Sequence, residues 1–185
     1  LDDYLITSIL NEVQINSTAQ GLVAGENLSQ ILSQIINLIE RLESLARKFD
    51  PLLAECLAIN NLLKAETFTQ GKKQEVLGAL SILNNREQEP DKTDWEVNIS
   101  ENEIEFFRFV RGVRSSKILH RSQVESPEFV AVNRIGTAIE ELFVGGCNVI
   151  IKGQEYKITL PSKLMTQVFD ISKKGITVQR FKGLG

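Results

Sequence analysis

The feature that most constrains this chain is an apolar stripe between residues 28 and 49. Its members recur at intervals of three and four residues: Leu28, Ile31, Ile35, Leu38, Leu42, Leu45 and Phe49. Because this spacing places side chains on one side of a helix, it predicts a long amphipathic α-helix of about six turns. Such a helix must bury one face, so other parts of the chain, or a partner, have to cover it.

Two further helices are predicted directly after the stripe. Asp50-Pro51 combines a capping side chain with a proline suited to a first helical turn, so a second helix should begin there. Helical spacing over residues 72–84 predicts a third. These helices favour an intramolecular bundle over a dimerisation seam, because a coiled coil needs several sustained heptads with charged flanks.

The apolar period changes beyond a polar segment, residues 84–94, that is interpreted as a linker. Alternation over 95–99 and the β-favouring composition of 104–113 predict a hairpin. Ile118 is placed in a further short strand.

The remaining sequence alternates between the two periods. Predictions are a strand within 4–16, a helix over 129–143, a hairpin of 149–151 with 156–159, a helix over 162–175 and a strand over 176–180. The expected fold class is therefore α+β. Its expected parts are an opening strand in 1–16, a helical subdomain in 17–90, a mixed α+β subdomain in 91–175, and a strand and loop in 176–185.

Composition bears on where the protein works. No apolar run reaches the roughly 20 residues that cross a bilayer, so we expect no membrane partner and a cytoplasmic location. Cys56 and Cys147 lie far apart, with no cysteine or histidine at ligand spacing, and are expected to be buried, reduced thiols.

No catalytic residue can be assigned from the residues alone. The chain has no phosphate-binding loop, dinucleotide fingerprint or zinc-binding helix. His120, the single histidine, is interpreted as a surface or strand-end residue. Glu101, Glu103 and Glu105 alternate on one expected strand face and could bind a cation. A solvated hairpin is favoured, and no metal is assigned.

A basic and aromatic stretch without any acid covers residues 106–124. Such a mixture is typical of surfaces that contact DNA or a protein partner, and a charge-protected edge strand explains it equally well. On a straight strand, Arg108 and Arg114 would face one way and Arg111 and Lys117 the other. The residues of this candidate surface are Arg108, Arg111, Arg114, Lys117 and Arg121.

A second basic cluster lies near residue 185. Gly183 and Gly185 allow close approach of the backbone to a phosphate, and Arg180 and Lys182 supply positive charge. The overall net charge of −3 is nevertheless far from a basic DNA-binding footprint.

These last residues carry a resemblance to a known family. The segment Gln179–Gly185 reads Q-R-F-K-G-L-G and resembles the Q-R-Y-K-G-L-G segment of DNA gyrase B subunits, which are type IIA topoisomerases. Looser similarities at residues 1–4, 24–28, 49–51 and 93–95 resemble the large insertion that Gram-negative members carry within their toprim domain.

The resemblance implies an architectural role. The insertion would assist DNA binding and coupling in ATP-dependent negative supercoiling, with the gyrase A subunit and double-stranded DNA as partners. Arg180, Lys182, Gly183 and Gly185 would position the DNA backbone, although Phe181 replaces the usual tyrosine. The toprim acids, an E-G-D-S-A loop and a D-x-D pair, are absent from this sequence. Catalysis, magnesium and ATP would therefore belong to the rest of the parent enzyme.

Two alternatives remain open. The chain could be a standalone interaction module that recruits a protein through the heptad helix, with the terminal motif coincidental. It could also be an independent DNA-binding domain, which predicts strongly salt-dependent affinity for DNA.

Overall fold

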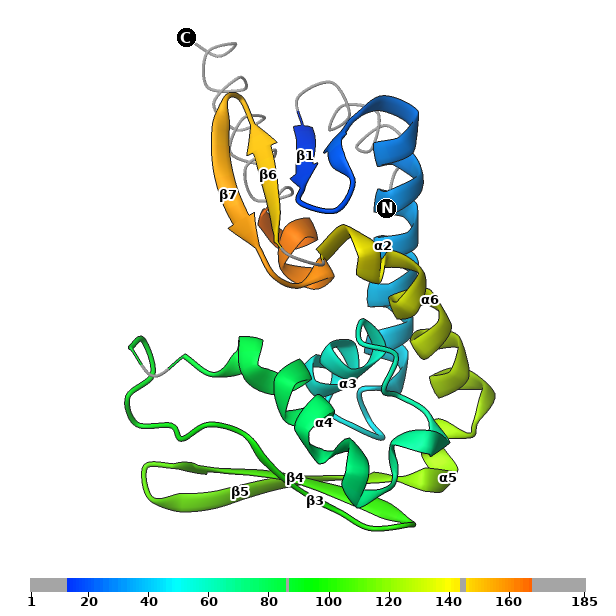
Figure 1. Ribbon diagram of the computed structural model, residues 1–185, viewed down its shortest axis with the longest axis vertical. Helices are drawn as coiled ribbons and strands as arrows, with labels where there is room; N and C mark the ends of the chain where they lie inside the picture. The colour runs from blue at the N-terminus through cyan, green and yellow to red at the C-terminus, as the bar shows by residue number, and fades with distance from the viewer. Residues whose placement is uncertain (1–12, 86, 144–145, 168–185) are drawn as a thin grey trace, which may run out of the picture. The chain divides into compact units, whose positions relative to one another are not determined.

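The computed structural model describes residues 13–85, 87–143 and 146–167. It has helices and two antiparallel sheets, which confirms the predicted α+β class (Figure 1). None of the helices in this described part is both long and apolar enough to span a bilayer.

The chain divides into two compact units. One groups residues 1–37 with 141–185, and the other contains residues 38–140. In the first unit, strands that lie far apart in the chain pair with one another.

The described core of the first unit is a four-stranded antiparallel sheet in the order β2-β1-β6-β7. Burial alternates along the two central strands, so one face of each contributes to the core. The strands are β1 (Val13–Ser17), β2 (Gly21–Val23), β6 (Cys147–Ile151) and β7 (Gln154–Ile158).

The β6–β7 hairpin confirms the second predicted hairpin, with a tighter turn than expected. Lys152 and Gly153 have φ angles of 51° and 81°, and Ile151 pairs with Gln154. Two consecutive positive φ angles are the mark of a two-residue type I′ turn, whose twist matches that of the strands. A helix over residues 161–167 follows, in the place predicted.

The predicted long helix is α2 (Gly25–Leu45). It ends one turn before Phe49, because the N–H groups of Lys48 and Phe49 both donate to the Leu45 carbonyl and close the last turn. The chain itself covers most of the stripe, which disfavours its use as a dimer seam. The side chains that are no more than 5% exposed are Leu28, Leu32, Ile35, Leu38, Leu42, Leu45 and Phe49.

Helix α3 (Pro51–Ala58) begins at the predicted position. Asp50 Oδ1 accepts hydrogen bonds from the N–H groups of Leu52 at 2.9 Å and Leu53 at 3.1 Å. These contacts satisfy two of the N–H groups that lack partners at the start of a helix.

The third predicted helix is also present, as α4 (Lys73–Leu80) extended by the short 3₁₀ helices η2 (Gln70–Lys72) and η3 (Ser81–Leu83). A further short 3₁₀ helix, η1 (Ala65–Thr67), precedes them.

The second sheet has the order β3-β4-β5, with all neighbours antiparallel. Its strands are β3 (Glu96–Ile99), β4 (Glu103–Val110) and β5 (Val113–His120). The strand predicted over 104–113 in fact turns at residues 111–112. Ile118 therefore belongs to a full-length partner strand, not to a separate short one.

One face of this second sheet is covered by α3 and α4 (Figure 1). The Phe106 side chain is fully buried there, and its ring centroid lies 5.6 Å from that of Phe49. The buried strand residues of this face are Val97, Ile99, Ile104, Phe106 and Leu119.

Two helices complete this part of the chain: α5 (Arg121–Val124) and α6 (Pro127–Phe143), the latter in the place predicted. Gly136 of α6 lies against α3, where an added Cβ would be 2.7 Å from the carbonyl carbon and Cβ of Ala58. This close approach of two backbones explains why the position is a glycine.

Replacing Gly136 by alanine should destabilise the chain by about 1–3 kcal/mol, because the backbone of α3 or α6 must shift to admit the methyl group. Gly78→Ala is the matched control, since a Cβ at that helical position meets nothing within 4 Å. It should stabilise the chain by about 0.5–1 kcal/mol. Urea unfolding followed by circular dichroism measures both, and a neutral Gly136→Ala would contradict the proposed packing.

Candidate interface on the second sheet

The β4–β5 hairpin decides where the basic residues of the candidate surface lie. Arg111 and Gly112 have φ angles of 52° and 78°, and Val110 pairs with Val113 across a two-residue turn. The turn reverses the strand, so Arg108 and Arg114 lie on opposite faces of the sheet. On a straight strand they would have shared one face, but the strand is interrupted by this turn.

Arg108 lies on the face covered by the helices. Its guanidinium carbon is 4.4 Å from the centroid of the Trp95 ring, and Trp95 is only 7% exposed. The Arg108 Nε is buried and has no hydrogen-bond partner in the described part of the chain. This arginine is therefore part of the packing around Trp95.

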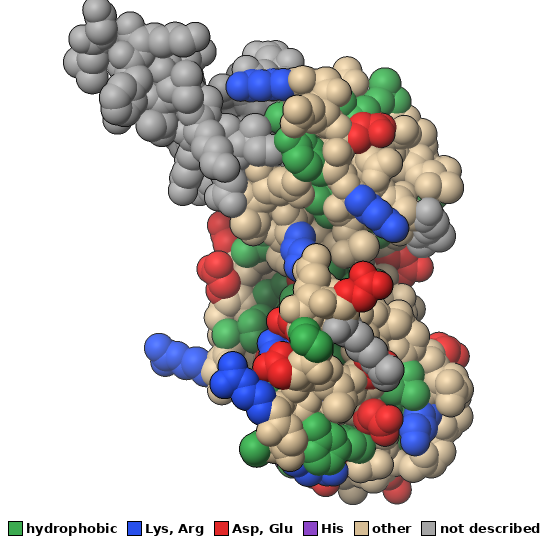
Figure 2. Space-filling view, turned by 90° about the vertical axis from the view of Figure 1, so that its left-hand side faces the viewer, with side chains coloured by type: hydrophobic (Ala, Val, Ile, Leu, Met, Phe, Trp, Pro, Cys, Tyr) green, Lys and Arg blue, Asp and Glu red, His purple; other side chains and the backbone are tan. Residues whose placement is uncertain are grey.

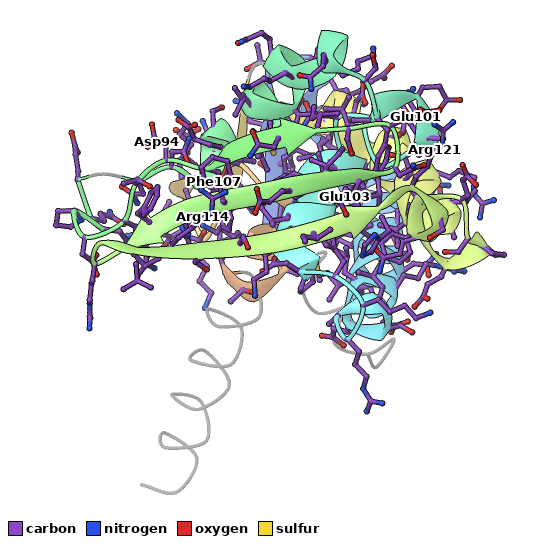
Figure 3. The ribbon with its side chains drawn as sticks, turned by 90° about the horizontal axis from the view of Figure 1, so that it is seen from below. Asp94, Glu101, Glu103, Phe107, Arg114 and Arg121 are labelled. Carbon is purple, nitrogen blue, oxygen red and sulfur yellow. The ribbon has the colours of Figure 1, made fainter. Side chains whose placement is uncertain are left out.

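Arg114 lies on the outer face, stacked on an aromatic ring. Its guanidinium carbon is 4.0 Å from the centroid of Phe107, and Nη2 donates to Glu105 Oε1 at 2.9 Å. Figure 3 shows Phe107 and Arg114 side by side. Glu105 also accepts a hydrogen bond from Asn98 Nδ2 at 3.1 Å, so this carboxylate already has two partners.

The expected alternation of three glutamates along one strand holds for only two of them, Glu103 and Glu105, which lie on β4. Glu101 precedes β4 and offers its backbone carbonyl to Arg121 Nη1 at 3.3 Å. Glu103 Oε2 lies 4.0 Å from His120 Nδ1 at the strand end, where both side chains are about half exposed. Within the described ranges, no three histidine, cysteine, aspartate or glutamate residues are grouped so that they could hold a metal ion.

The remaining basic residues lie at the two ends of the hairpin and at its edge. At the turn, Arg111 Nε donates to Asp91 Oδ2 at 3.2 Å, and this hydrogen bond holds the pKa of Asp91 below its usual value. In α5, Arg121 Nε donates to Glu125 at 3.1 Å. Lys117, on β5, is exposed and makes no ion pair with the described residues.

The five basic residues therefore do not form one patch. Sequence inspection found no acid between residues 106 and 124, but folding brings Asp91, Glu105 and Glu125 to three of the arginines. On the face shown in Figure 2, acidic and basic side chains are likewise interspersed. A surface with this mixture is better suited to a protein than to the phosphate backbone of DNA.

The structure adds an apolar component that the sequence analysis missed. Phe109 and Ile118, on the outer face of the β4–β5 hairpin, are 39% and 42% exposed, and Val113 beside the turn is 69% exposed. Strand alternation identifies two faces, but it does not say which of them the helices leave open.

The terminal basic cluster cannot be placed in the same way. Arg180, Lys182, Gly183 and Gly185 lie outside the described residues, so their contact with DNA stays a prediction. Both cysteines are reduced and buried, as expected. Burial raises the pKa of the Cys147 thiol to about 11, which keeps it protonated at neutral pH.

Arg108 and Lys117 offer a test of which basic residues are structural. Arg108→Ala removes the contact with Trp95 and the packing of the arginine stem, and should destabilise the chain by about 1–2 kcal/mol. Lys117→Ala, an exposed change on the same face, should remain within about 0.5 kcal/mol. Tryptophan fluorescence during urea unfolding reports both, because Trp95 is the single tryptophan. Equal stability of the two variants would refute the structural role of Arg108.

Comparison with known proteins identifies the relatives of this chain, although no protein-family model matches it. The DNA gyrase B subunit of Rickettsia bellii (strain RML369-C) is 40% identical over 185 residues, which is 100% of this chain and 23% of the relative. The DNA gyrase B subunit of Rickettsia conorii has the same identity and coverage. That of Caulobacter vibrioides is 21% identical, again over the whole chain.

The chain thus spans less than a quarter of the length of these relatives. The resemblance predicted from the terminal motif is confirmed: over its whole length the chain is similar to one region of the DNA gyrase B subunits of these bacteria.

Proposed function

We propose that the chain is an insertion module of a gyrase B subunit, which assists DNA binding and couples it to ATP-dependent negative supercoiling. The observation that carries the proposal is the 40% identity to gyrase B subunits over all 185 residues. Because the chain covers only 23% of those relatives, its role is proposed as that of a part within a larger enzyme.

The organisation of residues 38–140 supports an inserted module. This unit has its own core, formed by the second sheet and the helices that cover it. Within this unit the chain near the end of α2 and the chain at the start of α6 come together, where Lys48 Nζ is 2.7 Å from Glu128 Oε2. The segment between these two residues therefore begins and ends at one place, and such a segment can be inserted into another fold without displacing its flanks.

The rest of the parent enzyme would supply the chemistry. We propose that ATP, magnesium and the DNA-cleaving tyrosine all belong to other parts of the gyrase complex, whose A subunit and double-stranded DNA are the proposed partners. The proposed location is the cytoplasm. The burial of the α2 stripe disfavours the alternative of a module that recruits partners through that helix.

DNA contact is proposed at the terminal motif and not at the hairpin. Arg180, Lys182, Gly183 and Gly185 combine positive charge with a backbone that can approach a phosphate closely. In contrast, Arg111, Arg114 and Arg121 already pair with carboxylates of this chain.

Deleting most of the second unit from the parent enzyme should impair supercoiling without unfolding the rest of the enzyme. Residues 50–125 can be replaced by a short Gly-Ser linker, because the side chains of Lys48 and Glu128 are in contact. We expect supercoiling to fall by about tenfold or more, whereas DNA-independent ATP hydrolysis and the thermal unfolding of the ATP-binding part stay unchanged. Supercoiling assays of purified wild-type and deleted enzyme measure the difference, and unimpaired supercoiling would exclude the proposed role.

The terminal cations allow a separate test in the parent enzyme. Each cation that neutralises a phosphate contributes about 0.9 to the slope of log affinity against log salt, so Arg180→Gln with Lys182→Gln should lower that slope by about 1.8. The matched control is Lys152→Gln with Lys157→Gln, two exposed lysines of the β6–β7 hairpin. DNA-binding titrations at several salt concentrations give the slopes. The same slope in both double variants would show that the terminal motif does not hold DNA.

A further inference from the structure

The β5 strand forms a free edge of the second sheet. Among the described strands its only neighbour is β4, and it extends over eight residues without a proline or a bulge in its register. Natural proteins usually shorten, cover or distort such edges, because an open row of N–H and C=O groups invites another strand. In Figure 3 the edge runs along the outside of the sheet.

The register defines which backbone groups of β5 are available. In a two-residue type I′ hairpin, the residues that flank the turn form a hydrogen-bonded pair, and such pairs alternate along an antiparallel ladder. Val113, Ser115, Lys117 and Leu119 therefore bond to β4. The N–H and C=O groups of the intervening residues point away from β4, and these residues are Arg114, Ser116, Ile118 and His120.

Two hydrogen bonds agree with this assignment. Arg121 follows in the alternation as a residue that faces β4, and its N–H donates to the Asn102 carbonyl at 2.9 Å. His120 is one of the residues that face away from β4, and its N–H donates to the side chain of Gln123 at 2.9 Å. The α5 end of the edge is thus occupied by Gln123, which leaves Arg114, Ser116 and Ile118 to receive a partner.

We propose that the β5 edge binds an extended acidic segment of another protein, which adds to the sheet as a further antiparallel strand. This proposal goes beyond the gyrase role and does not depend on it. Main-chain hydrogen bonds would supply much of the affinity, and side chains on alternate positions the selectivity.

The side chains of β5 specify the chemistry of the partner strand. Lys117 is exposed and makes no ion pair within the part of the chain that is described, so an acidic residue opposite it would complete a cross-strand pair. On the outer face, Ile118 is 42% exposed and favours an apolar, β-branched neighbour. The segment that fits therefore alternates acidic and β-branched residues.

Other occupants fit this edge less well. A second copy of β5 would bring Arg114 and Lys117 to the same edge without any acid, and like charges between strands destabilise the pairing. DNA fits less well because Arg111 and Arg114, the nearby arginines, are already paired with carboxylates of this chain.

The test uses the 185-residue chain and a fluorescent peptide of about ten residues in which valine and glutamate alternate. Fluorescence anisotropy should show saturable binding that weakens as salt is added. A peptide with lysine in place of every glutamate should bind about tenfold more weakly or not at all. Equal binding of the two peptides would refute the acidic specificity.

Ser116→Pro tests the strand addition itself. Its N–H points away from β4, so proline removes no bond of the existing ladder but blocks pairing with an added strand. Peptide binding should fall by about tenfold or more, whereas the matched Ser116→Ala variant should bind as the wild type does. Circular dichroism checks that the sheet persists.

Lys117→Glu provides a second variant that leaves the backbone unchanged, in case the proline disturbs the fold. This variant should bind the glutamate peptide several-fold more weakly and the lysine peptide several-fold more tightly. Three results would overturn the proposal: full binding by Ser116→Pro with an intact sheet, a wild-type dimer that this variant abolishes in sedimentation experiments, or displacement of the peptide by duplex DNA.

Discussion

Burial of the apolar stripe on α2 is the constraint on which the rest of the structure depends. Each fully buried leucine or isoleucine contributes about 1.5–3 kcal/mol, so a helix with this many buried side chains is stable only when the stripe is covered. Leu28, Leu32 and Ile35 are buried in the first compact unit, and Leu38, Leu42 and Leu45 in the second. One continuous helix therefore contributes to two cores.

The hairpin turn at Arg111 and Gly112 has the largest effect on the candidate interface. It places Arg108 against Trp95 in the packed layer and Arg114 on the outer face with Phe107. Carboxylates from other segments then pair with Arg111, Arg114 and Arg121. The basic residues look like one continuous cluster in the sequence, but in the structure three of them are paired with carboxylates. What the described sheet leaves unpaired is the outer edge of β5.

Two independent observations support the proposal of an inserted module: the similarity to gyrase B subunits and the organisation of the second unit. The first matches the whole chain to about a quarter of the length of gyrase B subunits, 23% in one relative. The second is a separate core in which the end of α2 and the start of α6 meet at Lys48 and Glu128. An inserted module of this kind can acquire its own binding surface without altering the fold that carries it.

The sequence by itself determined most elements and the resemblance to gyrase B subunits, because helix periodicity, the Asp50 cap and the terminal motif are local properties. The tertiary structure decided which strands pair, which face of the second sheet is covered and which arginines meet an acid. These depend on contacts between residues far apart in the chain, such as Val13 with Ile151 or Asp91 with Arg111. A one-residue difference in where a strand turns reverses every side chain beyond it. The β-favouring composition on both sides of Arg111 and Gly112 does not by itself fix that position.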